Sequence, residues 1–185
     1  MPPSTDASPP PPPSTDVAAR LARYRVPLGF ALGAVALVLA RPTGSSLATG
    51  CLVAIAGEAM RLWAAGHVEK GREVTTSGPY RWTRHPLYVG STVIGVGLAI
   101  ATASVPAALM IGAYLAASFT AAIRTEEGEL TAKFGDDYRN YRHGLTTGTS
   151  RRFSLARAWR NREQRAVAGL VAGAVLLALR WILRV

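Results

Sequence analysis

Long apolar runs restrict this chain more than any other feature of its sequence. They cover residues 26–40, 47–65, 87–103, 105–123 and 166–183. A helix needs about 20 apolar residues to cross a bilayer, with tolerance down to about 17, so the middle three runs are long enough and the outer two recruit flanking residues. Because hydrocarbon offers the backbone no hydrogen-bond partner, each run is predicted to be helical. The sequence therefore predicts an all-α, multi-pass transmembrane helical bundle of about five spans.

The distribution of charge also indicates a membrane protein. The chain is 49% hydrophobic and only 17% charged, yet its net charge is +10, and the basic residues lie outside the apolar runs, as expected beside anionic lipid headgroups. Removing the runs leaves no basic, aromatic-bearing soluble domain, which argues against nucleic acid as a partner. Lys and Arg precede the first run and gather at residues 70–84 and 124–165. The positive-inside rule therefore predicts a cell-membrane protein whose N-terminus and these two segments face the cytoplasm.

The two ends of the chain differ in composition from the apolar core. Residues 1–19 are rich in Pro and lack the positive start and apolar centre of a signal peptide, which predicts a disordered tail. Residues 20–149 form the predicted membrane core. Residues 150–185 join a basic, aromatic linker, typical of an interfacial amphipathic helix, to a final apolar helix. That helix is expected to cover the core or to pair two copies in a homo-oligomer.

Two short blocks carry most of the functional information. Residues 84–90 read R-H-P-L-Y-V-G, and residues 126–141 read E-E-G-E-L-T-A-K-F-G-D-D-Y-R-N-Y. In this order, and separated by one hydrophobic hairpin, they resemble the isoprenylcysteine carboxyl methyltransferase and phospholipid methyltransferase superfamily. The resemblance covers roughly residues 50–145. It implies an integral membrane methyltransferase that uses S-adenosylmethionine as cofactor and a lipophilic small molecule as substrate.

The hairpin explains how the two blocks can form one cofactor site on the cytoplasmic face. Antiparallel helices of about 17 residues rise roughly 25 Å each, so His85 returns to the membrane face that holds Glu126 and Glu127. Pro86 suits the first position of a helix, and the backbone N–H groups at such an N-terminus form an anion site, here for the cofactor's carboxylate. Glu126 or Glu127 would then face its ammonium group.

The resemblance further implies roles for individual residues. The family positions that contact the cofactor correspond here to Tyr80, His85, Pro86, Leu87, Tyr88 and Glu126, with Val74 and Thr75 in a stretch that lines it mainly through backbone. Methyl transfer depends mainly on alignment in a water-poor site, so no metal is expected, and the three histidines lack metal-ligand spacing. An acceptor amine or hydroxyl must also lose a proton, and Glu127 or His85 could take it.

One departure from the family pattern bears on the acceptor. In the prenylcysteine-specific members, an arginine four residues before the first glutamate holds the substrate carboxylate. That position is Ala122 here, and Arg124 follows two residues later, about 200° around a regular helix. Arg124 is therefore a candidate catalytic residue beside Glu127, although it does not simply replace the clamp. A small isoprenoid, phospholipid or other lipid is favoured over a prenylated protein terminus.

Several alternatives stay open at the level of sequence. A basic, aromatic stretch before an apolar helix is often only an interfacial anchor, which would suit a non-enzymatic membrane scaffold. Sterol reductases that bind NADPH have a distantly similar C-terminal region but are longer. Glu58 and Arg61 lie three apart on one helical face. Three interpretations of this pair stay open. The two side chains neutralise each other, or Arg61 extends to the membrane surface, or the pair contributes to a polar wall of the active site.

Overall fold

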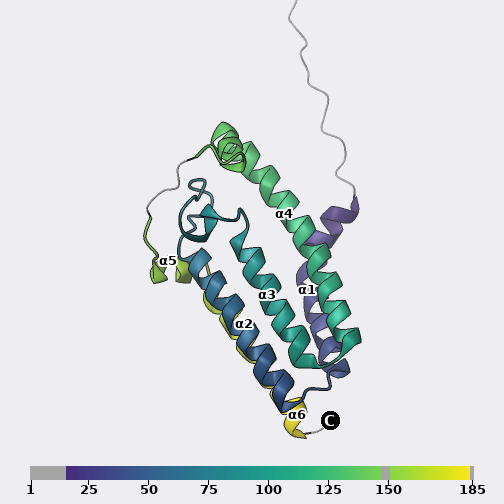
Figure 1. Ribbon diagram of the computed structural model, residues 1–185. Coiled ribbons are helices and arrows are strands. Elements are labelled where there is room, and N and C mark those ends of the chain that lie inside the picture. Colours follow the sequence, from purple (N-terminus) through teal and green to yellow (C-terminus); the bar gives the residue numbers. More distant parts are fainter. Residues whose placement is uncertain (1–15, 147–150, 184–185) are drawn as a thin grey trace, which may run out of the picture.

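The computed structural model describes residues 16–146 and 151–183, and within these ranges all regular structure is helical. The prediction of an all-α fold is confirmed (Figure 1). The elements are α1 (Asp16–Leu39), α2 (Gly44–Ala65), the 3₁₀ helix η1 (Gly78–Arg81), α3 (Pro86–Thr102), α4 (Val105–Arg142), α5 (Leu155–Arg160) and α6 (Glu163–Leu183).

All five apolar runs form helices, although their lengths differ. In the described part of the chain, α2, α4 and α6 are long and apolar enough to cross a membrane, whereas Pro27–Leu39 and Pro86–Thr102 are shorter apolar helical segments. Large apolar side chains such as Phe30, Leu52 and Leu109 are mostly exposed on the bundle surface. An exposed apolar surface of this kind suits contact with lipid tails rather than with water. The chain is therefore a helical membrane protein.

Two helices extend beyond the expected boundaries. The predicted disordered tail, residues 1–19, lies mostly outside the described residues, but α1 already begins at Asp16. Helix α4 continues well past the end of its apolar run at residue 123 and ends at Arg142. Its polar extension contains three Glu and three Arg, which favour helix without requiring a lipid environment.

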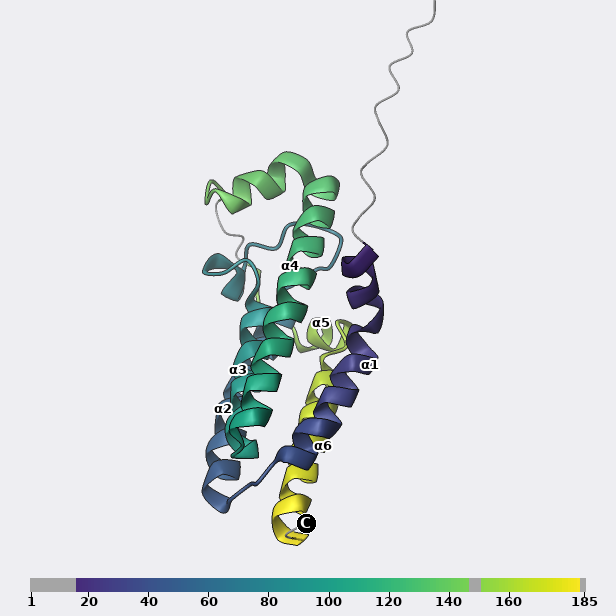
Figure 2. The same cartoon turned by 90° about the vertical axis from the view of Figure 1, so that its right-hand side faces the viewer.

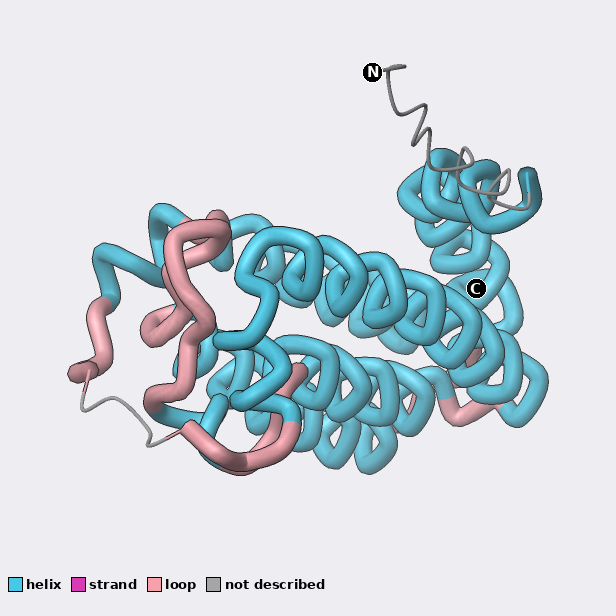
Figure 3. The backbone as a smooth tube through the Cα atoms, turned by 90° about the horizontal axis from the view of Figure 1, so that it is seen from above, coloured by secondary structure: helices cyan, strands magenta, loops and turns pink. Residues whose placement is uncertain are grey.

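The helices alternate in direction along the bundle. Helices α1, α3 and α6 run from one end to the other and α2 and α4 run back, with α6 lying along α2 and α1 along α4 (Figures 1 and 2). The connections 66–85 and 143–162 therefore lie at the same end, which we call the motif end. Seen from above, the loops of the motif end gather on the side of the bundle away from α1 (Figure 3).

Glycines allow α2 and α3 to pack backbone against backbone. A Cβ atom added at Gly50 would lie 2.5 Å from the Gly97 carbonyl oxygen, and one at Gly57 would lie 2.7 Å from the Gly90 carbonyl oxygen. Small residues that permit such an approach are the usual basis of helix packing in membranes, where lipid removes the hydrophobic driving force. This tight pair fixes where α3 begins, and therefore where His85 lies.

Capping groups define the helix ends that carry the site. Pro86 occupies the first turn of α3 with His85 as the preceding cap residue, as expected from the missing N–H of proline. The α3–α4 turn consists of Ala103 in the left-handed conformation and Ser104, whose hydroxyl accepts from the Ala107 N–H. This tight turn produces the antiparallel hairpin that the sequence predicted.

A kink closes the motif end. Helix α4 leaves helical geometry at Gly135, where φ is 50°, a value that glycine adopts at little cost. The following segment turns across the end of the bundle (Figure 2). There the Tyr141 hydroxyl donates to the Tyr80 carbonyl at 2.7 Å, and Tyr138 is 1% exposed. The end of α4 thus covers the loop between α2 and α3.

Candidate active site

A large cavity of about 1680 Å³ opens at the motif end. Its walls come from α1, the 68–75 loop, the start of α3 and much of α4. All residues predicted to bind cofactor line it, and so does Arg124: they are Val74, Thr75, Tyr80, His85, Pro86, Leu87, Tyr88, Glu126 and Arg124. Glu127 is absent from the lining. The structure therefore gathers residues from both sequence blocks around one space.

The hairpin brings the two blocks into direct contact. His85 Nε2 lies 3.2 Å from Glu127 Oε1, although 42 positions separate these residues. Arg84 Nη1 lies 3.1 Å from the same carboxylate oxygen. Glu127 thus joins the second half of α4 to the start of α3 from a position outside the cavity lining.

The electrostatic environment of Glu127 keeps its carboxylate ionised. Partial burial alone would raise the pKa of Glu127, but the hydrogen bond with His85 and the positive charges of Arg84 and Arg142 outweigh it, so the pKa lies below its ordinary value. A carboxylate that is paired in this way is a weak proton acceptor. Its position suits it better to orient His85 than to act on a substrate.

Among the described residues that line the cavity, three have a buried polar atom without a hydrogen bond. One is Arg61 Nε, which lies 3.7 Å from Glu58 Oε2 in an ion pair; the other two are His85 Nδ1 and the Tyr138 hydroxyl. Buried polar groups are nearly always paired. These two atoms therefore indicate where a polar ligand would bind.

Aromatic side chains form part of the wall. Tyr88 stacks edge-on against Phe119, with ring centroids 5.2 Å apart, and lies 5.9 Å from the ring of His85. Tyr80 is 8% exposed. Burial, followed by the negative charge of Glu126, raises the pKa of the Tyr80 phenol well above its usual value, so that phenol stays neutral at physiological pH. The wall offers aromatic surface close to a carboxylate.

Arg124 is exposed and forms no ion pair with a described residue. Between Val105 and the kink at Gly135, α4 has no other non-helical residue, so Ala122 and Arg124 do point in directions about 200° apart. Both nevertheless line the cavity, because it extends around α4. Arg124 is thus available to a ligand, but on a different side of α4 from Ala122, the position of the clamp arginine in the prenylcysteine-specific members.

The sequence did not reveal an ion pair that crosses the cavity wall. Arg61 Nη2 lies 2.9 Å from Glu163 Oε2, and both residues line the cavity. Arg61 also donates to the Ser91 hydroxyl and lies 3.7 Å from Glu58. Of the alternatives that the sequence left open, the pairing of Glu58 with Arg61 is present, and Arg61 lines the cavity whereas Glu58 does not. No sequence pattern links Arg61 to Glu163, which is 102 positions away.

Comparison with known proteins agrees with this geometry. Residues 57–137 match the model of the phospholipid methyltransferase family. Together with the similarity to protein-S-isoprenylcysteine O-methyltransferases, this match confirms the resemblance to the isoprenylcysteine and phospholipid methyltransferase superfamily that the sequence showed.

Individual relatives are similar over part of their length. The chain is 40% identical over 82 residues to a nickel-cobalt-cadmium resistance protein of Alcaligenes xylosoxydans xylosoxydans, over 42% of this chain and 38% of the relative. It is 31% identical over 93 residues to the protein-S-isoprenylcysteine O-methyltransferase of Schizosaccharomyces pombe, a match that covers 50% of this chain and 39% of the relative. It is also 31% identical over 122 residues to a cobalt-zinc-cadmium resistance protein of Cupriavidus metallidurans, a match that covers 62% of this chain and 56% of the relative. The chain thus spans about two fifths to just over half of these relatives, and no solved structure matches it.

Proposed function

We propose that this protein is an integral membrane enzyme that transfers a methyl group from S-adenosylmethionine to a lipophilic acceptor. The observation that carries the proposal is the single cavity at the motif end, which collects every predicted cofactor-binding residue from both sequence blocks. The superfamily match supports the same reaction class.

The polar lining fits this cofactor. When bound, S-adenosylmethionine supplies an electrophilic methyl group on a positively charged sulfur. Glu126 would hold the cofactor's ammonium by a charge-assisted contact, and the N-terminus of α3 at Pro86 would hold its carboxylate. The unpartnered atoms of His85 and Tyr138 would bind its other polar groups, and the face of Tyr88 suits a cationic sulfur.

The cavity has room for a second molecule beside the cofactor. Its volume of about 1680 Å³ exceeds the roughly 300–1,000 Å³ that is typical of a site for one small ligand. Away from the motif end it continues between α1 and α4, where Leu28, Leu32 and Met110 line it. An acceptor with an apolar chain that enters from the bilayer matches this extension.

The chain's own residues would align the acceptor and manage its proton. Alignment in a site that excludes water provides most of the rate of such a transfer. A carboxylate or thiolate acceptor needs no base, whereas an amine or hydroxyl must lose a proton. His85 is better placed than Glu127 to accept this proton, because His85 lines the cavity, whereas Glu127 lies outside the lining and contacts His85 Nε2. Arg124, which is exposed and lines the cavity, is free to bind an acidic group of the acceptor.

The proposal includes an orientation. The basic segments 70–84 and 124–165 lie at the motif end, so we place the motif end and the N-terminus in the cytoplasm of a cell-membrane protein. S-adenosylmethionine is made there. The division into a core of residues 20–149 and an added segment 150–185, and pairing of two copies through α6, stay predictions.

Other functions find less support in the structure. Two relatives are named as metal resistance proteins, names that say nothing of how those proteins act. No specific observation favours the sterol-reductase-like or the scaffold interpretation over methyl transfer.

Calorimetry with S-adenosylhomocysteine tests the first step of this proposal. The purified protein in detergent should bind this product with micromolar affinity, because the cavity supplies a carboxylate, a helix N-terminus and aromatic faces for it. NADPH serves as the control ligand and should not bind. Binding of NADPH in place of S-adenosylhomocysteine by folded protein would favour a reductase and overturn the proposal.

A further inference from the structure

The C-terminal end of α2 has no basic residue of its own in its last turn. The last four carbonyl groups of any helix lack partners within the helix, and a positive charge near that end is stabilising. The chain that follows, residues 66–77, contains no regular secondary structure. The N–H groups of Gly66, His67 and Val68 satisfy the Leu62 and Ala64 carbonyls locally, whereas the Ala65 carbonyl and the loop take partners from elsewhere in the molecule.

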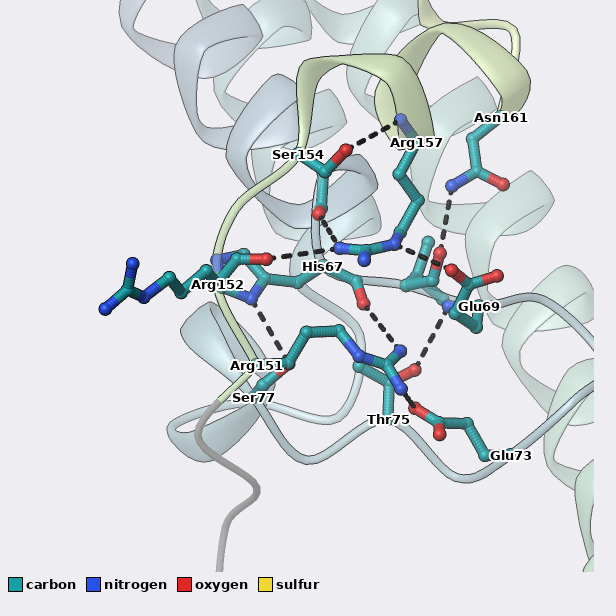
Figure 4. Close-up of polar contacts among 12 residues, drawn as sticks. His67, Glu69, Glu73, Thr75, Ser77, Arg151, Arg152, Ser154, Arg157 and Asn161 are labelled. Atoms are coloured by element: carbon teal, nitrogen blue, oxygen red, sulfur yellow. Dashed lines mark hydrogen bonds and ion pairs between the residues drawn. The ribbon is translucent and has the colours of Figure 1, made fainter.

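Residues 151–163, which we call the strap, supply these partners from more than 75 positions away. Asn161 Nδ2 donates to the carbonyls of Ala65 at 2.8 Å and Val68 at 3.0 Å. Arg157 Nη1 and the Ser154 N–H donate to the Gly66 carbonyl (Figure 4). The strap thus adds donors from distant positions to the local cap of α2 at Gly66.

The strap also holds the loop through ion pairs. Arg157 Nε lies 2.8 Å from Glu69 Oε1, and the two side chains are only 15% and 19% exposed. Arg151 pairs with Glu73 and donates to the His67 carbonyl (Figure 4). Partial burial makes such pairs stronger than ordinary surface ion pairs, because solvent screens them less.

Close packing reinforces these polar contacts. A Cβ atom added at Gly66 would lie 2.2 Å from the ring of Phe153, and the same ring lies 6.3 Å from that of His67. The strap therefore fits against the start of the loop with no space for a side chain at Gly66.

The loop that the strap holds is a wall of the cavity. Glu69, Glu73, Val74 and Thr75 all line it. The Glu69 N–H donates to the Thr75 hydroxyl at 3.3 Å, and Thr75 is 6% exposed. Glu69 therefore links Arg157 of the strap to Thr75, a residue expected to line the cofactor.

We propose that the strap is a positioning element that holds the 68–75 wall in the shape that binds the cofactor, with Arg157 and Asn161 as its principal positioning residues. A loop without regular structure would otherwise lose conformational freedom upon binding, and prior ordering removes that cost. This inference rests on the proposed function. The strap lies beyond residues 57–137, the part of the chain that matches the family.

Binding and kinetics of Arg157→Ala in the full-length protein test the inference. We expect the Kd for S-adenosylhomocysteine and the KM for S-adenosylmethionine to rise about tenfold, with the KM for the lipid acceptor unchanged. Arg157→Lys should recover part of the affinity, because it restores the charge opposite Glu69 but not both contacts. Hydrogen exchange of residues 68–75 should be faster in Arg157→Ala without ligand.

Arg160→Ala provides the matched control, because it removes the same charge from the same short helix at an exposed position. It should bind like the wild type and show wild-type exchange. If Arg157→Ala remains folded and binds S-adenosylhomocysteine as the wild type does, the inference is wrong while the proposed function stands. An equal rise in both KM values would indicate a general structural role and also contradict it. A wild type that binds no cofactor would remove the proposed function and this inference together.

Discussion

At the scale of single residues, the structure separates two glutamates that are adjacent in the sequence. Glu126 lines the cavity, whereas Glu127 lies outside its lining and pairs with Arg84 and His85. The spacing alone left either glutamate to face the cofactor's ammonium, because the direction of each side chain depends on how α4 packs against α3, and only the family resemblance assigned Glu126 to the cofactor. The motif residues themselves were predictable, whereas the pairing of Arg61 with Glu163 joins positions that share no local pattern.

This separation makes Glu126→Gln and Glu127→Gln a matched pair of variants. Glu126→Gln should weaken binding of S-adenosylhomocysteine by roughly 10- to 150-fold, because losing one charge-assisted contact costs about 1.5–3 kcal/mol. Glu127→Gln should leave that affinity close to the wild-type value, since its carboxylate does not line the cavity. Calorimetry in detergent measures both. Unchanged affinity in Glu126→Gln together with a loss in Glu127→Gln would reverse the assignment.

At the scale of helices, the apolar runs predicted the elements because a membrane allows few alternatives to helix. Their lengths were less predictable. The polar half of α4 had no apolar pattern to mark it, and the kink at Gly135 depends on one residue with positive φ. The partners of the strap were not predictable either, because each contact joins residues more than 75 positions apart.

The glycine contacts between α2 and α3 predict a specific sensitivity. Gly97→Ala would place a Cβ atom 2.6 Å from the Ala54 nitrogen and the Gly50 carbonyl oxygen. Backbone atoms cannot move aside as a flexible side chain can, so the variant should lose about 1–3 kcal/mol of stability. The measurement is the thermal unfolding midpoint in detergent.

Gly112→Ala is the control for this prediction. No atom lies within 4 Å of a Cβ atom added at Gly112, and alanine favours helix over glycine by up to about 1 kcal/mol. Its unfolding midpoint should equal or exceed that of the wild type. Equal stability of Gly97→Ala and Gly112→Ala would show that α2 and α3 pack less closely than described.

At the scale of the whole molecule, the hairpin, the kink and the strap serve one arrangement. The α3–α4 hairpin brings the two motif blocks to the same end, the end of α4 covers the loop between α2 and α3, and the strap holds that loop from the other side. The cavity that results joins a polar end to an apolar extension between α1 and α4. This combination is what a transfer from a polar cofactor to a lipophilic acceptor requires.

The most direct test of this account is to follow a labelled methyl group. Membranes that contain the wild-type protein are incubated with methyl-labelled S-adenosylmethionine and then separated into lipid, protein and water-soluble fractions, with Glu126→Gln membranes as the control. The account predicts that label enters the lipid fraction with the wild type and falls sharply with the variant. Label confined to water-soluble products, or equal labelling of lipid by both proteins, would contradict it.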